Sequence, residues 1–417
     1  MIGYEQALAI VLDAAPILST EDVALADVRG RVLAHTVCSP AWLPPFDNAA
    51  MDGFALASSG RSVAVTTELR VRGSQAAGAP QCRGDIGGVG AWEIMTGARL
   101  PDGLDTVVPV EQVETQVGQG ACPSAIRLMA PVRPGQHVRR RGEDVAVGDP
   151  VIVAGERLLA PQIMLLHALG VSQVAVRRRP RVAVISTGHE LVDDPKQPLH
   201  SGQIRDCNRP FLCMKACEAG AEVVWHGCVD DDPSTYHQAL ERALAQAPDL
   251  VLSSGAVSAG RYDFIPDALR ARGAEIAFHE VAIRPGKPLL FARLKEGPLY
   301  FGLPGNPVSS AVGQRFFIEP ALRAMLGLPR ERPLRMPLSV PLRKPERLRL
   351  HARAVVTCDA QGALSAALLP QQEPFRLMPM LAANAWVVAE PGAAELSAGH
   401  HVEVYGLGHW QSIQLQG

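Results

Sequence analysis

The spacing of hydrophobic positions changes along the chain, and the clearest change falls near residue 180. Beyond it, short apolar runs are separated by stretches with apolar residues at helical spacing, around 208–219 and 234–246. Strands that alternate with helices favour right-handed crossovers, so the pattern predicts a doubly wound, largely parallel α/β sheet. The predicted strands are RVAVIST, AEVVWHG, DLVLSSG, PLLFARL and PLYFGLPG, followed by a last long helix over 307–326.

The pattern differs on either side of this region. An amphipathic helix is expected over about 4–18, and β-like runs broken by Gly and Pro between about 60 and 140 indicate a small all-β domain. After residue 328, a Pro- and Arg-rich stretch leads into β-like runs that predict a separate C-terminal β domain. A chain of 417 residues is long enough for several domains.

Composition narrows the classes of partner. The chain is 47% hydrophobic and 20% charged, with a formal net charge of -2, which is the profile of a soluble globular protein. This balance gives no bulk reason to expect nucleic acid or an anionic membrane as a partner. The Arg triplets at 139–141 and 177–179 fit solvated loop or strand ends better than polyanion sites.

The N-terminal residues and the cysteines indicate in which cellular compartment the protein is expected. Glu5 and Asp13 interrupt the apolar pattern of the N-terminal stretch, which favours an amphipathic helix over a signal peptide. No apolar run approaches the ~18 residues that a membrane span needs. The eight cysteines include no Cys-x-x-Cys pair, which favours reduced structural thiols over disulfides or a zinc site. We therefore expect a cytoplasmic protein.

Small residues follow the predicted strands at the edge where parallel strands end. Open α/β sheets bind ligands beyond these carboxyl ends. Small side chains there let backbone N–H groups approach an anion. The loops at 186–190 and 253–260, the second of which contains Ser254, Gly255 and Ser258, are therefore predicted to form a phosphate cradle.

Carboxylates also follow the predicted strands at this edge of the sheet, which we call the rim. Glu190, Asp231 and Asp263 each follow a different strand, so we expect them to converge. Clustered carboxylates repel one another unless a cation joins them, and oxygen ligands beside phosphate favour Mg²⁺. The combination predicts a Mg²⁺-bound nucleotide or diphosphate. For Asp231 and Asp232, capping of the helix that begins near Ser234 is the alternative.

Two further stretches complement the rim. In IRPGKP, Arg284 and Lys287 can neutralise an anion, although a lysine in a turn most often faces solvent. In GLPGNPVSS, Asn306 is a good N-cap and Pro307 fits a first helical turn, so this rigid loop would hold a helix N-terminus toward an anion. An ordinary tight strand-to-helix turn explains the same loop equally well.

A second dense motif lies in the first third of the chain. PPFDNAAMDGFAL holds two turn signals, Asp47-Asn48 and Asp52-Gly53, interleaved with apolar side chains, and so many constraints on one turn favour a site. Thr96, Asp105 and Asp144 add polar groups in Gly-bounded loops. Surface turns explain these three residues equally well.

Eight motifs, in this order, resemble the molybdopterin molybdenumtransferase family, which comprises the bacterial MoeA proteins and the E domain of gephyrin. They are PPFDNAAMDGFAL, MTGARLPDGLDTVVPVE, GEDV, STGHEL, GQIRDCN, SSGAVSAGRYDF, IRPGKP and GLPGNPVSS, and the resemblance runs over about 4–410. It implies a transferase, usually a homodimer, that inserts molybdate into adenylylated molybdopterin with release of AMP. The implied domains are an elongated linking domain (1–45 and 141–175), a small β-rich domain (46–140), the α/β domain (176–327) and a C-terminal β domain (328–417).

The resemblance also implies roles for individual residues. Glu190, Asp231 and Asp263 would organise Mg²⁺ and the attacking group, while Asp52 and Asp144 would complete the catalytic set from the neighbouring subunit. The residues implied in substrate binding are Thr96, Ser254, Gly255, Ser258, Arg284, Lys287, Pro304 and Ser309. Besides its substrates and a second copy, the implied partners are, transiently, the molybdopterin adenylyltransferase and molybdoenzyme chaperones.

The chain departs from the family pattern at three of these motifs. His189 stands where the family commonly has Asp, Ala256 where it has Gly, and Arg284 where it has Lys. Ala256 adds a methyl group to a loop that is expected to approach phosphate. Arg284 keeps the charge but not the point-like geometry of an ammonium group.

Two other functions fit parts of the pattern. Adenylylation of molybdopterin by ATP, the preceding step, needs only a domain like 176–327, so residues 1–170 and the C-terminal domain argue against it. The other is a non-catalytic, gephyrin-like scaffold. Retention of the acidic rim and of the MDG motif favours catalysis over this scaffold.

Overall fold

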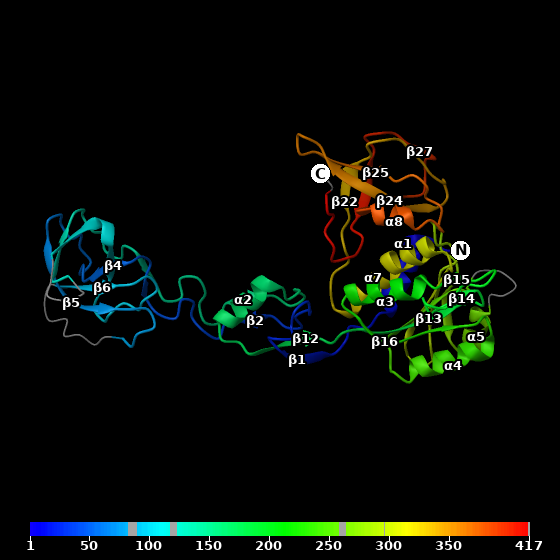
Figure 1. The fold of residues 1–417 in the computed structure, drawn as a ribbon, viewed down its shortest axis with the longest axis horizontal. Helices are drawn as coiled ribbons and strands as arrows, with labels where there is room; N and C mark the ends of the chain where they lie inside the picture. Colours follow the sequence, from blue (N-terminus) through cyan, green and yellow to red (C-terminus); the bar gives the residue numbers. More distant parts are fainter. Residues whose placement is uncertain (82–89, 117–122, 258–263, 296, 416–417) are drawn as a thin grey trace. The chain divides into compact units, whose positions relative to one another are not determined.

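A computed structural model describes residues 1–81, 90–116, 123–257, 264–295 and 297–415 (Figure 1). Their contacts group them into two compact units. The first comprises Met1–Glu21, Gly30–Ala34 and Val176–Gly417, and the second comprises Asp22–Arg29 and His35–Ala175. Within these described ranges, none of the helices has the length and apolar character to cross a bilayer. The six cysteines of the described part are free thiols.

A six-stranded sheet forms the centre of the first unit, in the order β16-β13-β17-β21-β20-β18. Its first four strands are parallel, as the alternation of strands and helices predicts. The strands are β13 (Arg181–Thr187), β16 (Glu222–Val229), β17 (Leu250–Ser254), β18 (Glu275–Phe278), β20 (Leu290–Arg293) and β21 (Leu299–Leu303). This sheet is the doubly wound core of the predicted fold class.

One strand runs against the predicted direction. β20, which contains PLLFARL, is antiparallel to β21 and to β18, so the expectation that it continues the parallel sheet is wrong. The reason is the short connection 294–298, because a parallel crossover needs about a dozen residues and an antiparallel hairpin needs only a few. The sequence pattern also missed β18.

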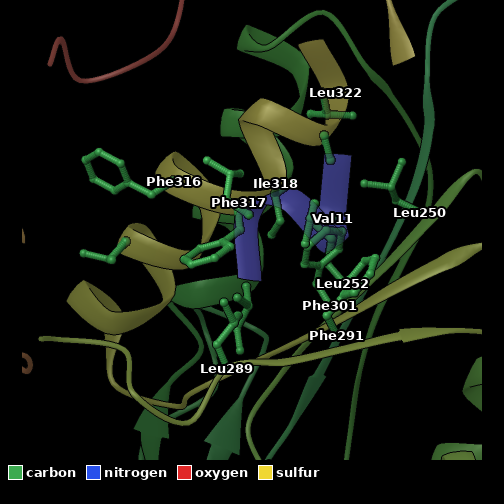
Figure 2. Close-up of a cluster of buried hydrophobic side chains, with 14 of the residues drawn as sticks. Val11, Leu250, Leu252, Leu289, Phe291, Phe301, Phe316, Phe317, Ile318 and Leu322 are labelled. Carbon is green, nitrogen blue, oxygen red and sulfur yellow. The ribbon is translucent and has the colours of Figure 1, made fainter. Parts of the chain in front are cut away.

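Helices cover both faces of this sheet (Figure 1). On one face, α1 (Tyr4–Ala14), α3 (Asn208–Glu218) and α7 (Glu319–Met325) bury apolar side chains, and on the other α4 (Pro233–Leu244) and α5 (Ile265–Ala271) do so. In Figure 2, Val11 of α1 lies with Leu252 and Phe301 of the sheet in one buried cluster. Burial of α1 here groups Met1–Glu21 with the α/β sheet, and the linking domain that the resemblance implies over 1–45 and 141–175 stays a prediction.

The last long helix is continuous but not uniform. It consists of α6 (Pro307–Gly313), a π-helical turn (Gln314–Ile318) and α7. Pro320 has no N–H to donate to the Phe316 carbonyl four residues earlier, which accounts for the irregular turn. That carbonyl accepts a hydrogen bond from the Tyr4 hydroxyl at 3.3 Å.

A second sheet in the same unit has the order β19-β24-β26-β28-β22, with β25 paired to β24. Every residue of β26 is buried, and side chains of β24, β26 and β28 form the core of this region. The elements are β19 (Ile283–Arg284), β22 (Leu334–Pro337), β24 (Arg349–Cys358), β25 (Leu364–Leu368), β26 (Ala385–Ala389), β28 (His401–Tyr405) and the short helix α8 (Met378–Ala382). Two-residue strands β23 (Leu342–Arg343) and β27 (Glu395–Leu396) pair beside it.

The second unit contains a six-stranded sheet in the order β7-β4-β6-β5-β9-β8. It falls in the region where the sequence predicts a small β-rich domain. Its strands are β4 (Gly53–Leu56), β5 (Glu68–Gln75), β6 (Gly90–Ile94), β7 (Thr106–Pro109), β8 (Val113–Gln116) and β9 (Ala125–Leu128). This unit also contains β2 (Val37–Cys38), β3 (Asn48–Ala49), the short helix η1 (Val110–Gln112), β10 (Val138–Arg139), β11 (Pro150–Ile152) and α2 (Ala160–Ala168), while β1 (Thr20–Ala24) and β12 (Gln173–Arg177) cross the border between the two units.

Candidate functional site

A cavity of about 600 Å³ lies at the carboxyl ends of β13, β17 and β21. The predicted residues Glu190, Asp231, Ser254, Gly255 and Pro304 all line it. The other described lining residues are Thr187, Leu191, Ile204, Arg205, Asp206, Cys207, Asn208, Ala256, Val257, Pro288, Gly305, Asn306, Pro307 and Phe375. The sheet therefore brings together loops that are more than a hundred residues apart in the sequence, at the edge where the strand order predicts a ligand.

The small-residue loop after β17 approaches β13 closely. Gly255 has φ +100, and a Cβ built there would lie 2.3 Å from the Thr187 carbonyl oxygen, so a side chain is excluded. Ala256 follows with φ 51, a left-handed conformation that disfavours residues with a Cβ. The departure from the family pattern at Ala256 thus falls on a position where glycine is the unstrained residue.

The two adjacent aspartates after β16 have different partners. Asp232 caps α4, with its Oδ1 accepting hydrogen bonds from the backbone N–H groups of Ser234 at 2.9 Å and Thr235 at 3.0 Å. Asp231 Oδ2 accepts from the His189 N–H at 3.4 Å, and its buried Oδ1 has no hydrogen-bond partner among the described residues. The capping alternative therefore holds for Asp232 and leaves Asp231 for the cavity.

The carboxylates offer part of a cation site. Glu190 and Asp231 line one cavity, and the orphaned Asp231 Oδ1 is a hard oxygen of the kind that Mg²⁺ binds. Asp263 and Ser258 lie outside the described residues. Within the described ranges, no three His, Cys, Asp or Glu side chains are grouped closely enough to hold a metal ion. The predicted Mg²⁺ thus has two candidate carboxylate ligands among the described residues, and its binding stays a prediction.

Asn208, at the start of α3, fixes the cavity wall and was missed as a site residue. Its Nδ2 donates hydrogen bonds to Ser254 Oγ at 2.8 Å and to the Gly305 carbonyl at 2.7 Å. One amide therefore joins the loop after β17 to the loop after β21. The signal in the sequence was GQIRDCN, which was recognised as a motif without a role for its last residue.

Hydrogen bonds both within the GLPGNPVSS loop and to a distant loop hold it in place. Asn306 occupies the N-cap position and Pro307 the first turn of α6, as predicted, but in the described structure the Asn306 side chain makes no capping hydrogen bond. The backbone N–H of Val308 instead donates to the Pro374 carbonyl at 3.0 Å. Ser310 Oγ donates to the Pro304 carbonyl at 2.5 Å. One hydrogen bond within the loop and one to the Pro374 carbonyl therefore hold it, in place of a side-chain cap.

Besides Thr96, which belongs to the second unit, three predicted substrate-binding residues of the first unit lie outside the described cavity lining. Arg284 is exposed on β19, Lys287 pairs with Glu280 at 3.3 Å, and Ser309 is buried in α6. Pro288, next to Lys287, does line the cavity. The roles of Arg284, Lys287 and Ser309 stay predictions.

The MDG motif of the second unit forms a polar pair with a distant loop. Asp52 Oδ1 accepts hydrogen bonds from the backbone N–H of Thr96 at 2.6 Å and from its hydroxyl at 2.8 Å. The backbone donor, followed by the hydroxyl, lowers the pKa of Asp52 below its usual value. Asp144 is exposed in the same unit. Asp105 is instead structural, because its carboxylate accepts hydrogen bonds from Ser58 and Thr106.

The fold and cavity define a class: a doubly wound α/β domain with a cavity at the carboxyl ends of its strands, in a chain that also contains β-rich domains. Comparison with known proteins narrows this class. Family models match over residues 2–170 (MoeA N-terminal region, domain I and II), 183–324 (probable molybdopterin binding domain) and 335–407 (MoeA C-terminal region, domain IV). The chain belongs to the molybdopterin molybdenumtransferase family and is a transferase, as the sequence motifs predicted.

Individual relatives agree with this assignment. The chain is 37% identical to molybdopterin molybdenumtransferase of Synechococcus elongatus over 98% of this chain and 100% of that protein. It is 31% identical to the Bacillus subtilis protein of the same name, over 92% and 89% of the two chains. The crystal structure of the molybdopterin biosynthesis MoeA protein from Pyrococcus horikoshii matches with a TM-score of 0.80 and 30% identity, over 98% of this chain and all of that one. Because the matches extend well beyond the α/β domain, they favour this family over an adenylyltransferase.

Proposed function

We propose that the chain transfers molybdenum from molybdate to adenylylated molybdopterin, with release of AMP, and that the reaction takes place in the cavity of the α/β unit. The observation that carries this proposal is one cavity that joins Glu190 and Asp231 to the Ser254-Gly255 loop. Small-residue loops can supply the hydrogen-bond donors that a diphosphate needs. Cleavage of a phosphoanhydride also needs neighbouring groups that stabilise the charge developing in the transition state. The name shared by the bacterial relatives supports the same reaction.

In this proposal, different side chains bind phosphate, hold the attacking group and limit access of water. Ser254 Oγ faces the ligand space and would bind a phosphate oxygen, while the Gly255 N–H donates to the Leu303 carbonyl at 3.1 Å and Asn208 keeps this loop against the loop at Gly305. Glu190 and Asp231 would hold the attacking group and accept protons released at the reacting centre. The wall of apolar and proline residues, including Val257 and Pro304, would limit access of water to the anhydride.

We propose Mg²⁺ as the cation of this site, held by Glu190 and Asp231 with a phosphate of the substrate. When bound, Mg²⁺ offsets the negative charge of the diphosphate and of the leaving AMP. The buried, unpartnered Asp231 Oδ1 supports this assignment, since an ionised oxygen without a donor is otherwise costly. Asp263, which the family resemblance adds to the set, would supply a further oxygen.

The proposal includes a homodimer in which Asp52 and Asp144 approach the cavity of the neighbouring copy. Asp52 and Thr96 form an exposed polar pair, and Met51, Met95 and Val110 expose large apolar side chains in the same unit. Exposed apolar groups beside an ordered polar pair suit contact with another protein surface. A cytoplasmic location belongs to the same proposal, and the free thiols of the described part are compatible with it.

The decisive experiment follows AMP release. The purified protein would be incubated with adenylylated molybdopterin, Mg²⁺ and molybdate, beside the variants Asp231→Asn and Asp232→Asn. Asp231→Asn should lower turnover by roughly a hundredfold or more, the scale of a lost acid–base or charge-stabilising group. Asp232→Asn is the matched control, because asparagine is an equally good N-cap and this side chain faces α4. Full turnover by Asp231→Asn would remove that residue from the mechanism.

A further inference from the structure

The C-terminal β region supplies an aromatic ring to the cavity. Phe375 is the one aromatic residue among the described lining residues. It belongs to none of the eight sequence motifs. It is 61% exposed, although phenylalanine is among the residue types most often buried. The Arg376 guanidinium lies over the ring, 5.4 Å from its centroid.

A buried arginine holds the loop that carries this ring. Arg353 of β24 has no exposed surface, and its guanidinium donates hydrogen bonds to three carbonyls of the loop, those of Gln371 at 3.0 Å, Glu373 at 3.4 Å and Arg376 at 2.5 Å. Gln372 returns a hydrogen bond to the Arg353 carbonyl at 2.8 Å. The backbone on both sides of Phe375 is thus fixed from inside the β sheet.

The same loop is joined to the α/β unit's site. The Pro374 carbonyl accepts the hydrogen bond from the Val308 N–H at the start of α6, directly after the Pro304–Pro307 wall of the cavity. The position of Phe375 relative to that wall is therefore set by a backbone contact one residue away. A preorganised ring loses little conformational freedom when a ligand packs on it.

We propose that Phe375 is a substrate-binding residue that stacks on a planar heteroaromatic ring of the ligand. The inference rests on the proposed function, because the adenylylated pterin is the ligand that supplies such rings, adenine at one end and pterin at the other. An exposed aromatic face beside phosphate-binding loops is the arrangement with which proteins hold a base without reading its edges. Phe375 would select for a ring-bearing ligand, while the loops after β17 and β21 bind its phosphates.

The test separates the ring from the phosphates. Binding of AMP and of inorganic pyrophosphate would be measured by calorimetry on the full-length protein and on Phe375→Ala, Phe375→Tyr and Leu381→Ala. KM and kcat for adenylylated molybdopterin would be measured on the same proteins. Leu381 is the control, because it is 81% exposed on the neighbouring α8 and does not line this cavity.

Loss of stacking should weaken ring binding by roughly 5- to 150-fold. If adenine stacks on the ring, Phe375→Ala weakens AMP binding by this factor and leaves pyrophosphate binding unchanged. Phe375→Tyr then restores AMP binding. If pterin stacks, AMP binding is unchanged and KM for adenylylated molybdopterin rises while kcat holds. Unchanged AMP affinity together with unchanged KM would overturn the proposal, as would an equal effect in Leu381→Ala.

Failure of the proposed transferase reaction can be distinguished from failure of the proposed role of Phe375. A wild-type protein that binds AMP through Phe375 but releases no molybdate-dependent AMP would contradict the transferase reaction and leave the stacking residue in place. In that case the AMP affinities alone decide the proposal for Phe375. A fully active Phe375→Ala variant with wild-type KM and wild-type AMP affinity would instead support the transferase reaction and contradict the stacking role of Phe375.

Discussion

Asp52 and Thr96, although 44 positions apart, form a two-pronged hydrogen-bonded pair on the surface of the β-rich unit. One carboxylate oxygen of Asp52 accepts both the backbone N–H and the hydroxyl of Thr96. The two donors stabilise the ionised carboxylate, and so they lower its pKa below the ordinary value of 3.8. The pair presents a fixed negative charge on an exposed turn.

The first prediction concerns this pKa. Thr96→Val removes the hydroxyl and keeps the backbone donor, so the Asp52 pKa should rise part of the way toward 3.8 in an NMR titration. Because the folded-state pKa is lowered, ionised Asp52 stabilises the fold above about pH 3.8, and this contribution is lost as the pH falls through the lowered pKa. Thr115→Val, at an exposed site on β8, should leave the titration unchanged. Identical titrations in all three proteins would contradict the role of the hydroxyl.

The second prediction tests whether Asp52 acts on the neighbouring copy. Asp52→Asn and Asp231→Asn should each be inactive alone. If each site combines Asp231 of one copy with Asp52 of the other, refolding an equal mixture creates one intact site in each mixed dimer, and about a quarter of the wild-type activity should return. AMP release from the mixture is the measurement. If the mixture stays as inactive as its components, Asp52 serves the cavity of its own chain or neither.

The third prediction contrasts two N-cap positions. Asp232→Ala removes two backbone hydrogen bonds at the start of α4 and should lower the urea midpoint of unfolding. Asn306→Ala should change stability by only about a few tenths of a kcal/mol, because Asn306 makes no capping hydrogen bond in the described structure. Equal losses in the two variants would argue that the Asn306 side chain contributes to the loop in another way.

The fourth prediction concerns the backbone of the phosphate loop. Gly255→Ala should destabilise the α/β unit by about 2 kcal/mol or more, since the new Cβ meets the Thr187 carbonyl at a φ of +100. Ala256→Gly should not destabilise it and should gain on the order of 0.5 kcal/mol, because relief of the left-handed alanine outweighs the greater freedom of glycine when unfolded. Denaturant titrations check both signs. A loss of stability in Ala256→Gly would show that the alanine methyl group makes a packing contact that outweighs the strain.

The fifth prediction concerns a buried carboxyl of α7. Burial raises the pKa of Glu319 from 4.5 to about 7, against the opposing charge of Arg315 at 3.4 Å. A raised carboxyl pKa means that the folded state holds its proton longer than the unfolded state, so the free energy of unfolding should fall as the pH rises from about 4.5 to 7. The Glu319→Gln variant should lack this slope. A wild-type stability that is flat across this window would contradict the raised pKa.

Several parts of the fold and site could be read from the chain alone. Apolar runs that alternate with helical spacing leave a parallel sheet as the compact solution, and the ends of those strands carry Ser254, Gly255, Asp231 and Glu190. The connection 294–298 was short enough to predict the antiparallel strand β20, but the apolar run before it hid that signal. The order of the motifs was sufficient for the family.

Other relationships depend on contacts that no local pattern encodes. Asp231 and Asp232 are chemically identical, and only the path of the chain after β16 makes one a helix cap and the other a cavity residue. Asn208 gains its role because two strand-end loops meet beside it. Phe375 reaches the cavity because Arg353, buried in another strand, holds its loop. The sequence by itself determined most of the strands and the edge where a ligand is expected, since these follow from local periodicity, and its ordered motifs determined the family. The tertiary structure decided which polar groups meet, since hydrogen bonds between distant loops depend on how the sheets pack.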